Sequence, residues 1–353
     1  MAKFRYLQTP FKLKNLELKN RIVMPPMCQY SATDGMPNDW HFVHYTARAI
    51  GGVGLIIVEM TNVAPNGRIT PKCLGLWNDE QRDAFKAIVD SVHKYGSKIA
   101  VQIGHAGRKA QDCDDVVAPS AIHYGELDYA GQNLKTPREL SKAEIQEVIQ
   151  SYQDAVKRAV EAGFDAIEIH GAHGYLIHQF SSPKSNQRSD EYGQDRFLFG
   201  EQVIKAAKAV MPADMPLIVR ISAQEFGADG FDADYGVEMA KRFAQAGADC
   251  MHVSAGGDGV LAEGKHPPFN AGYQVYLARA VKQATGLPTI AVGMLDDANV
   301  VDHVLAIGDA DLVGVGRALL RDPQWLLNVQ YAQNASNNSG IEFVPAQYQR
   351  GYF

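Results

Sequence analysis

The sequence predicts an α/β fold of the (β/α)8-barrel (TIM-barrel) type, on three observations. One pattern recurs along the chain: a helix ends in Ala or Ile, a glycine and often an Asp follow, and a β-branched strand comes next, at 49–58, 162–169, 246–253 and 307–315. Four further strand-like runs accompany these copies, at 22–27, 98–103, 216–221 and 288–293. No linker interrupts residues 1–353. Eight strands that alternate with helices predict a single barrel domain, with a doubly wound open sheet as the alternative.

Local signals support the individual elements in order. Residues 10–20 alternate apolar and charged side chains around Asn15, which predicts an N-terminal hairpin with one solvated face within residues 1–20. In each copy of the recurring pattern, the glycine is expected to cap the helix in a left-handed conformation and to return the chain to a parallel sheet. Ser141 and Glu144 form a predicted capping box at a helix start. Residues 335–353 follow the last helix as a C-terminal tail.

Composition and charge disfavour several classes of protein. Apolar residues make up 46% of the chain, enough for a full core, and the formal net charge of −6 disfavours a nucleic-acid-binding surface. No apolar run is long enough to span a membrane, and the first residues lack the apolar centre of a signal peptide, so we expect a cytoplasmic protein. The four cysteines lack Cys-x-x-Cys spacing, which disfavours a zinc or iron–sulfur site and a disulfide framework.

The segment from His170 to Tyr175 carries the strongest chemical signal. It follows a predicted strand over 166–169 and places two imidazoles, His170 and His173, and one phenol on a glycine-rich turn. Imidazoles can donate hydrogen bonds to a carbonyl oxygen, and a phenol can deliver a proton to carbon. Taken alone, the segment leaves three interpretations open: loop residues without a chemical role, a metal pair, or a substrate-binding site.

Other candidate groups fall at the C-terminal ends of the predicted strands, where barrels place their active sites. Two long segments leave from there, at 106–140 and 181–196, and are expected to act as lids. After the eighth strand, Gly314, Gly316 and Arg317 could hold a phosphate, as barrels often do at this point; tight helix packing is the alternative explanation of the glycines. No Gly-x-Gly-x-x-Gly follows a strand, so a Rossmann dinucleotide site is not predicted.

Four segments, in this order along the chain, resemble the thermophilic-like class of the Old Yellow Enzyme family. They are residues 20–31 (NRIVMPPMCQYS), 102–109 (QIGHAGRK), 168–176 (EIHGAHGYL) and 345–351 (PAQYQRG). The resemblance covers nearly the whole chain. It implies an FMN-binding barrel that takes electrons from NADPH or NADH in a ping-pong cycle. It also implies an ene-reductase, which reduces the activated C=C bond of α,β-unsaturated carbonyl compounds such as enones and enals.

The resemblance also implies a role for each matching residue. His170 and His173 would hold the carbonyl oxygen of the substrate, N5 of the reduced flavin would give a hydride, and Tyr175 would give the proton. Arg220 would place a cation near the N1–C2=O edge of the flavin; an interior ion pair with Glu168 is the alternative. The residues implied to line the flavin are Pro25, Pro26, Met27, Cys28, Met60, Gln102, Arg220, Gly293, Gly316 and Arg317.

Three further residues receive roles near the substrate. Cys28 would tune the flavin potential and contact the substrate, although a lone cysteine is more often a small buried apolar residue. Tyr30 would form a hydrogen bond within the pocket. Arg350 would enter the active site of a neighbouring subunit, which implies a homodimer or homotetramer.

The sequence departs from the family pattern in three places. Met60 stands where a smaller residue is expected, the loop over 190–197 is a few residues shorter, and Tyr352 stands where Trp is expected.

Three other functions are alternatives to the family's activity. A metal-dependent barrel lyase or isomerase would use His170, His173 and His178, but this interpretation assigns no role to Gln102 and Arg220. A longer iron–sulfur flavoprotein needs a cysteine cluster and further domains. A non-catalytic binding protein does not explain why so many polar groups converge at one end of the strands.

Overall fold

The computed structural model describes residues 4–111, 113–125, 134–227, 229–257, 267, 269–334 and 344–352. Eight parallel strands close into a barrel in the order β3, β4, β5, β8, β9, β10, β11 and β12. Their bounds are β3 Ile22–Met24, β4 Leu55–Asn62, β5 Lys98–Gly104, β8 Ala166–Gly171, β9 Leu217–Ser222, β10 Cys250–Ser254, β11 Thr289–Ala291 and β12 Leu312–Gly314. The predicted (β/α)8 barrel is therefore confirmed with all eight strands, and the open sheet is wrong.

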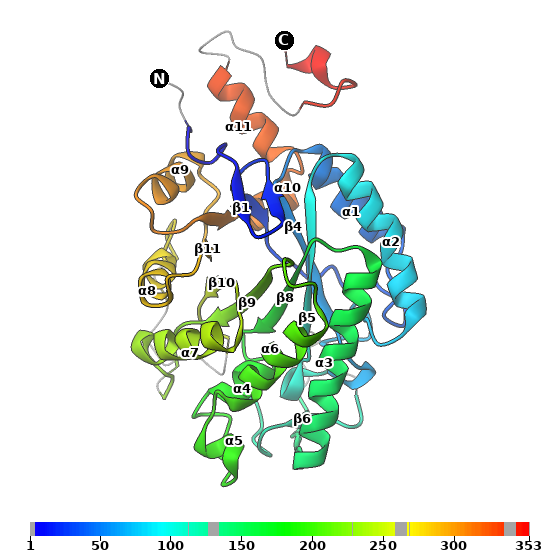
Figure 1. Cartoon of the computed structure of the whole chain (residues 1–353), viewed down its shortest axis with the longest axis vertical. Coiled ribbons are helices and arrows are strands. Elements are labelled where there is room, and N and C mark those ends of the chain that lie inside the picture. Colours follow the sequence, from blue (N-terminus) through cyan, green and yellow to red (C-terminus); the bar gives the residue numbers. More distant parts are fainter. Residues whose placement is uncertain are drawn as a thin grey trace.

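Helices surround the barrel and connect its strands (Figure 1). Their bounds are α1 Asp39–Ile50, α2 Asp79–Lys94, α3 Lys142–Ala162, α4 Leu176–Ser181, α5 Glu191–Gln194, α6 Leu198–Val210, α7 Ala233–Ala246, α8 Val275–Thr285, α9 Ala298–Ala306, α10 Arg317–Arg321 and α11 Trp325–Asn334. Short 3-10 helices are η1 Pro65–Gly67, η2 Gly107–Lys109 and η3 Gln349–Gly351. Within the described ranges, no helix has the length and apolar character needed to cross a membrane.

The helix caps show why these segments begin and end where they do. At the start of α3, Ser141 Oγ accepts from the Glu144 N–H (3.3 Å) and Glu144 Oε2 accepts from the Ser141 N–H (2.8 Å), which confirms the capping box. Gly163 ends this helix with φ 93°, as expected. After α1 the prediction is off by one residue. Gly51 keeps a right-handed φ of −69° and a helical hydrogen bond, and Gly52 takes the positive φ of 86°.

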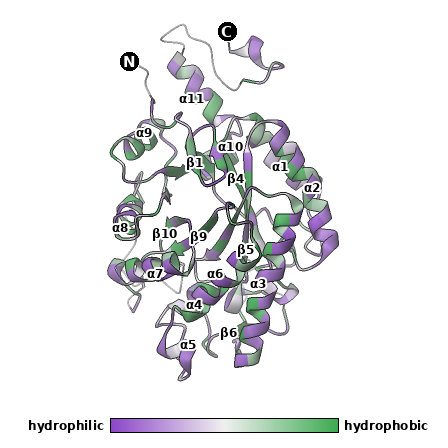
Figure 2. Ribbon diagram, in the orientation of Figure 1, coloured by the Kyte–Doolittle hydropathy of each residue, from purple (hydrophilic) through white to green (hydrophobic). Residues whose placement is uncertain are grey.

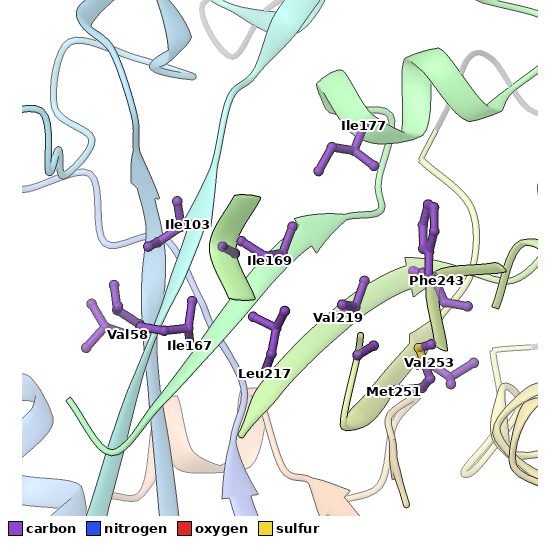
Figure 3. Close-up of a cluster of buried hydrophobic side chains, with 14 of the residues drawn as sticks. Val58, Ile103, Ile167, Ile169, Ile177, Leu217, Val219, Phe243, Met251 and Val253 are labelled. Atoms are coloured by element: carbon purple, nitrogen blue, oxygen red, sulfur yellow. The ribbon is translucent and has the colours of Figure 1, made fainter. Parts of the chain in front are cut away.

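Side chains on the strands alternate between the helices and the barrel interior. The outward residues pack under the helices: Figure 3 shows Ile169 of β8 and Val219 of β9 among buried side chains that include Ile177 of α4 and Phe243 of α7. The same helices carry hydrophobic and hydrophilic stripes, as Figure 2 shows for α2 and α3. This arrangement is expected for helices that cover a barrel on one side and meet water on the other.

The inward residues near the N-terminal end of the barrel form a separate apolar cluster. It contains Val23, Leu55, Ile57, Ala100, Ala166, Ile218, Cys250, Ile290 and Leu312. The predicted hairpin is present as β1 (Phe11–Leu13) paired antiparallel with β2 (Leu16–Leu18), and its buried Leu16 and Leu18 join this cluster. The hairpin thus packs against this interior layer, and the polar interior residues lie nearer the C-terminal ends of the strands.

The two long segments contain short elements of their own. The segment over 106–140 holds η2 and the two-residue strands β6 (Val117–Ala118) and β7 (Arg138–Glu139), and its residues 112 and 126–133 lie outside the described ranges. The segment over 181–196 holds α5, which Asp190 caps. Arg188 Nη2 pairs with Asp190 at 2.6 Å, so the shortened loop over 190–197 is fixed by an ion pair at its start.

Candidate active site

The turn after β8 brings His170, His173 and Tyr175 together. The ring of His170 lies edge-on to both others, with centroids 5.3 Å from His173 and 4.9 Å from Tyr175. Two consecutive left-handed residues make this turn, His173 with φ 59° and Gly174 with φ 72°. A Cβ at Gly174 would lie 2.1 Å from the Gly257 carbonyl oxygen, so only glycine fits there. Local chain geometry therefore gathers the three predicted catalytic rings.

Both histidines are held as neutral donors. Burial and then the positive charge of Arg220 lower the pKa of His170 and of His173 well below the ordinary value. His170 Nδ1 accepts a hydrogen bond from the Ala172 N–H at 3.3 Å, which leaves the proton of the neutral ring on Nε2. His173 Nε2 lies 2.9 Å from the Ser254 hydroxyl oxygen. The site thus offers uncharged imidazoles, of which His170 presents an Nε2–H.

The third histidine of the metal-dependent alternative is engaged elsewhere. His178 Nε2 lies 2.7 Å from Glu225 Oε1, and both side chains are 1% exposed. Over the part of the chain that the structure describes, no group of three or more His, Cys, Asp or Glu residues is placed to hold a metal ion.

A cavity of about 300 Å³ opens at the C-terminal ends of β3, β9, β11 and β12, and Ser254, the hydrogen-bond partner of His173, borders it. Seven of the ten residues implied to line the flavin border it: Pro25, Pro26, Met27, Arg220, Gly293, Gly316 and Arg317. Gly293 has φ 117°, and Gly316 has no side chain between its backbone and the cavity. Arg317 is exposed at the rim, where a guanidinium can pair with a phosphate.

A polar layer inside the barrel forms the floor of the site. Glu168 accepts hydrogen bonds from Gln102 Nε2 at 2.8 Å and from His252 Nδ1 at 2.6 Å, and all three side chains are buried. Gln102 thus lies in this floor layer rather than in the cavity wall. Burial lowers the pKa of Arg220, and the negative charge of Glu168 acts in the opposite direction. Among the described residues, Arg220 makes no ion pair with Glu168.

Arg220 provides the test of whether an FMN fits this cavity. Its side chain is 8% exposed, it borders the cavity, and its Nε has no hydrogen-bond partner within the described ranges. A buried guanidinium with an open donor calls for an electron-rich partner. The carbonyl-bearing edge of a flavin has this character, and the glycines and Arg317 at the far side suit its phosphate. The residues present therefore fit FMN.

Met60, Cys28 and Tyr30 lie in one apolar cluster with Tyr175. Cys28, Tyr30, Cys113 and Tyr175 pack against a small buried cluster that includes Met60 and Cys73. A Cβ at Gly104 would lie 3.1 Å from Met60 Cε and 3.2 Å from His170 Cβ, so Met60 and His170 both lie close to Gly104. The large side chain noted in the sequence is therefore buried near the turn that carries the histidines.

An irregularity in β4 brings Met60 inward. The register with β5 shifts between Val58 and Thr61, as in a β-bulge. Val58 packs in the outer core, and Glu59 also points outward, where Tyr45 Oη of α1 donates to Glu59 Oε1 at 3.0 Å. Two successive outward residues leave Met60 on the inside. Strict alternation would have placed Glu59 in the barrel instead.

Three residues to which the sequence analysis gave no role also shape the site. Lys109 Nζ donates to the His173 carbonyl oxygen at 3.0 Å and lies 5.4 Å from the centre of the Tyr175 ring. Glu59 Oε2 accepts from the Gln29 N–H at 2.7 Å and thereby holds the segment between Cys28 and Tyr30. Cys73 is buried in the cluster that includes Met60. Only Lys109 had a sequence signal, as a basic residue just after a strand end.

Arg350 does not reach the active site of its own chain. It is exposed on η3, and Figure 1 draws this C-terminal piece beside α11. The Tyr352 hydroxyl donates to Gln324 Oε1 at 3.1 Å, and its ring lies 5.6 Å from that of Tyr331. Of the tail over 335–353, residues 335–343 and 353 lie outside the described ranges.

Comparison with known proteins agrees with this geometry. The model of the NADH:flavin oxidoreductase / NADH oxidase family matches residues 6–336. An NADPH dehydrogenase of Clostridium acetobutylicum is 45% identical over 348 residues, which cover 97% of this chain and 98% of the relative. An NADPH dehydrogenase of Bacillus subtilis is 43% identical over 356 residues, which cover 99% of each. The solved structure of morphinone reductase superposes with a TM-score of 0.78 at 28% identity and covers 94% of this chain and 91% of its own. The chain therefore belongs to the NADH:flavin oxidoreductase / NADH oxidase family, and it is an FMN-dependent NADPH oxidoreductase of the Old Yellow Enzyme type.

Proposed function

We propose that this enzyme is an ene-reductase, which uses NADPH to reduce the activated C=C bond of enones, enals and related alkenes. The observation that carries the proposal is the convergence of two neutral imidazoles and one phenol, those of His170, His173 and Tyr175. His173 also contacts Ser254, which borders the cavity. A carbonyl oxygen needs hydrogen-bond donors, and the alkene carbon next to it needs a proton. This set of groups supplies both.

Each residue acts on a defined atom of the substrate. The His170 Nε2–H donates to the carbonyl oxygen, and His173 donates beside it when the Ser254 hydroxyl donates to His173 Nε2. These bonds strengthen as negative charge grows on that oxygen, so they favour the transition state over the bound substrate. The Tyr175 hydroxyl gives its proton to the carbon next to the carbonyl group.

The cofactor and the reductant share the same cavity. When bound, FMN would supply the hydride-transfer chemistry that links NADPH to the alkene. Arg220 would hold its carbonyl edge, and Gly293, Gly316 and Arg317 would hold its phosphate. The sequence contains no Rossmann fingerprint, which agrees with NADPH and the substrate using this one cavity in turn.

The test is turnover of the FMN-loaded protein with NADPH and cyclohexenone in the absence of oxygen. We expect one molecule of NADPH to be consumed for each molecule of cyclohexanone formed. His170→Ala should lower the rate by about 10²–10³-fold, because an oxyanion donor is lost. His303→Ala, which removes an exposed histidine of α9, is the matched control and should leave the rate unchanged. NADPH oxidation that needs oxygen and leaves the alkene intact would refute the proposal.

A further inference from the structure

A chain of polar side chains leads from the turn after β8 into the cavity wall. His173 Nε2 lies 2.9 Å from Ser254 Oγ at the end of β10, and Ser254 Oγ lies 3.2 Å from Gln274 Oε1 at the start of α8. Gln274 Nε2 lies 2.5 Å from Tyr273 Oη. Ser254, Gln274 and Tyr273 all border the cavity. The direction of the hydrogen bonds along this chain decides which ring nitrogen of His173 carries a proton.

The Ser254 hydroxyl has one proton and two neighbours that could accept it. If it donates to Gln274, its oxygen accepts from His173 Nε2–H, and Nδ1 of this ring has no proton. If it donates to His173 Nε2, the ring proton is on Nδ1. Burial and then the positive charge of Arg220 lower the pKa of His173 well below the ordinary value, so the ring is neutral and has a single proton. The two arrangements therefore exclude each other.

The two distances from the Gln274 amide show which arrangement fits. A half-turn of a side-chain amide exchanges its oxygen and nitrogen without changing its shape. The separation of 2.5 Å from Tyr273 Oη is too short for an N–H···O hydrogen bond and ordinary for O–H···O. The separation of 3.2 Å from Ser254 Oγ is long for O–H···O and ordinary for N–H···O. Both distances therefore favour an amide whose oxygen faces Tyr273 and whose nitrogen faces Ser254.

We propose that Gln274 is a positioning residue that acts through Ser254 to hold the ring proton of His173 on Nδ1. The Tyr273 hydroxyl donates to the Gln274 amide oxygen, and the Gln274 amide N–H donates to Ser254 Oγ. The Ser254 hydroxyl then donates to His173 Nε2. All the hydrogen bonds run in one direction, and each hydroxyl donates once. His173 is left with Nδ1–H as its donor to a ligand.

This direction gives the site its second donor. His170 presents Nε2–H, because its Nδ1 accepts from the Ala172 N–H at 3.3 Å. The centroids of the His170 and His173 rings are 5.3 Å apart, a spacing at which two N–H groups can donate to one oxygen. The reverse direction would offer that oxygen a lone pair of Nδ1 and would repel it. The use of this donor on a substrate rests on the proposed function, whereas the position of the proton does not.

NMR spectra of the FMN-loaded enzyme labelled with ¹⁵N-histidine test the proposal directly. Near neutral pH, couplings between the ring nitrogens and the ring C–H groups show which nitrogen carries the proton, and the signal missing in His173→Ala identifies the residue. We expect Nδ1–H in the wild type. Gln274→Met removes the donor to Ser254, so this hydroxyl can also accept from His173, and we expect the Nε2–H form to appear. Gln224→Met is the matched control: Gln224 accepts from the Tyr276 hydroxyl at 2.6 Å in an exposed contact, and its loss should leave Nδ1–H unchanged.

Phenolate binding gives a second readout that needs no turnover. The probe is para-chlorophenol, which contains no activated C=C bond and whose phenolate gives a charge-transfer band with oxidised flavin. We expect Gln274→Met and Ser254→Ala to weaken its binding by about 10-fold, because a donor to the oxyanion is no longer fixed. Gln224→Met should bind it as the wild type does.

Two results would overturn the proposal. One is a wild-type spectrum in which His173 carries its proton on Nε2, and poor folding of a variant cannot obscure this result. The other is a Gln274→Met enzyme in which both the ring proton and the phenolate affinity are unchanged. Cyclohexenone reduction plays no part in either readout, so failure of the proposed function is distinguishable.

Discussion

Replacing Glu59 with Gln should make the enzyme more stable at alkaline pH and leave it unchanged at acidic pH. Glu59 is fully buried between β4 and α1, where it accepts hydrogen bonds from the Gln29 N–H (2.7 Å) and the Tyr45 hydroxyl (3.0 Å). Burial outweighs these bonds and raises the pKa of Glu59 to about 8. In Glu59→Gln, the amide oxygen can still accept from Gln29, and the amide N–H can donate to Tyr45 Oη.

The sign follows from proton linkage. In the unfolded chain Glu59 loses its proton near its ordinary pKa of 4.5, but in the folded protein it keeps the proton up to about pH 8. The folded state therefore binds more protons within this window, and its stability falls as the pH rises through it. At about 1.4 kcal/mol per pH unit, the full loss is at most about 5 kcal/mol above pH 8. With an unfolding entropy of about 2 cal/mol/K per residue, this loss amounts to roughly 7 °C in the melting temperature.

The assay is thermal unfolding of the FMN-loaded protein at about pH 5 and about pH 9. We expect Glu59→Gln and the wild type to melt together at the lower pH and the variant to melt several degrees higher at the upper pH. Glu80→Gln removes the same charge from an exposed position in the first turn of α2 and controls for net charge. An equal difference between Glu59→Gln and the wild type at both pH values would show that Glu59 does not titrate as argued.

Three further predictions concern the active site and the tail. Tyr175→Phe should slow alkene reduction by about 10²–10⁴-fold and spare flavin reduction by NADPH, and stopped-flow spectra of the two half-reactions decide this. His252→Ala should lower the free energy of unfolding by about 3–5 kcal/mol in a denaturant titration, since buried Glu168 loses its partner at 2.6 Å; a change below 1 kcal/mol would be too small for that role. We also propose that Arg350 completes the site of a neighbouring subunit in a homodimer or homotetramer. Arg350→Ala should weaken ligand binding and truncation before Pro345 should weaken association in sedimentation experiments, whereas a fully active monomer would contradict this.

The barrel and the grouping of three rings after β8 could be predicted from sequence because their signals are local. The helix–glycine–strand pattern marks four returns to the sheet within about ten residues each, and four β-branched runs supply the other strands of a closed barrel. His170, His173 and Tyr175 lie on one short turn, and the glycines of this turn stand between them in the sequence. The phosphate-binding prediction stays untested, although Gly316 and Arg317 do border the cavity.

The walls and floor of the site depend on contacts between distant segments, which sequence spacing does not encode. Glu168 and His252 are 84 residues apart and meet only because β8 and β10 flank β9 in the closed barrel. Alternation along β10 places His252 on the same face as Ser254, but it does not predict which residue His252 contacts across the interior. The same holds for Cys28 and Cys73, whose loops are joined by backbone bonds that leave no compositional trace.

The bulge in β4 shows how a single local irregularity links these distant parts. It turns Glu59 outward against Tyr45 and leaves Met60 inward beside His170. Glu59, which points out of the barrel, accepts a hydrogen bond from the Gln29 N–H. This bond anchors the segment that carries Cys28. The negative charge of Glu59, once formed, also raises the pKa of the Cys28 thiol. One extra residue in a strand thus decides both the inward position of Met60 and the electrostatic surroundings of Cys28, so a change in either is expected to disturb the other.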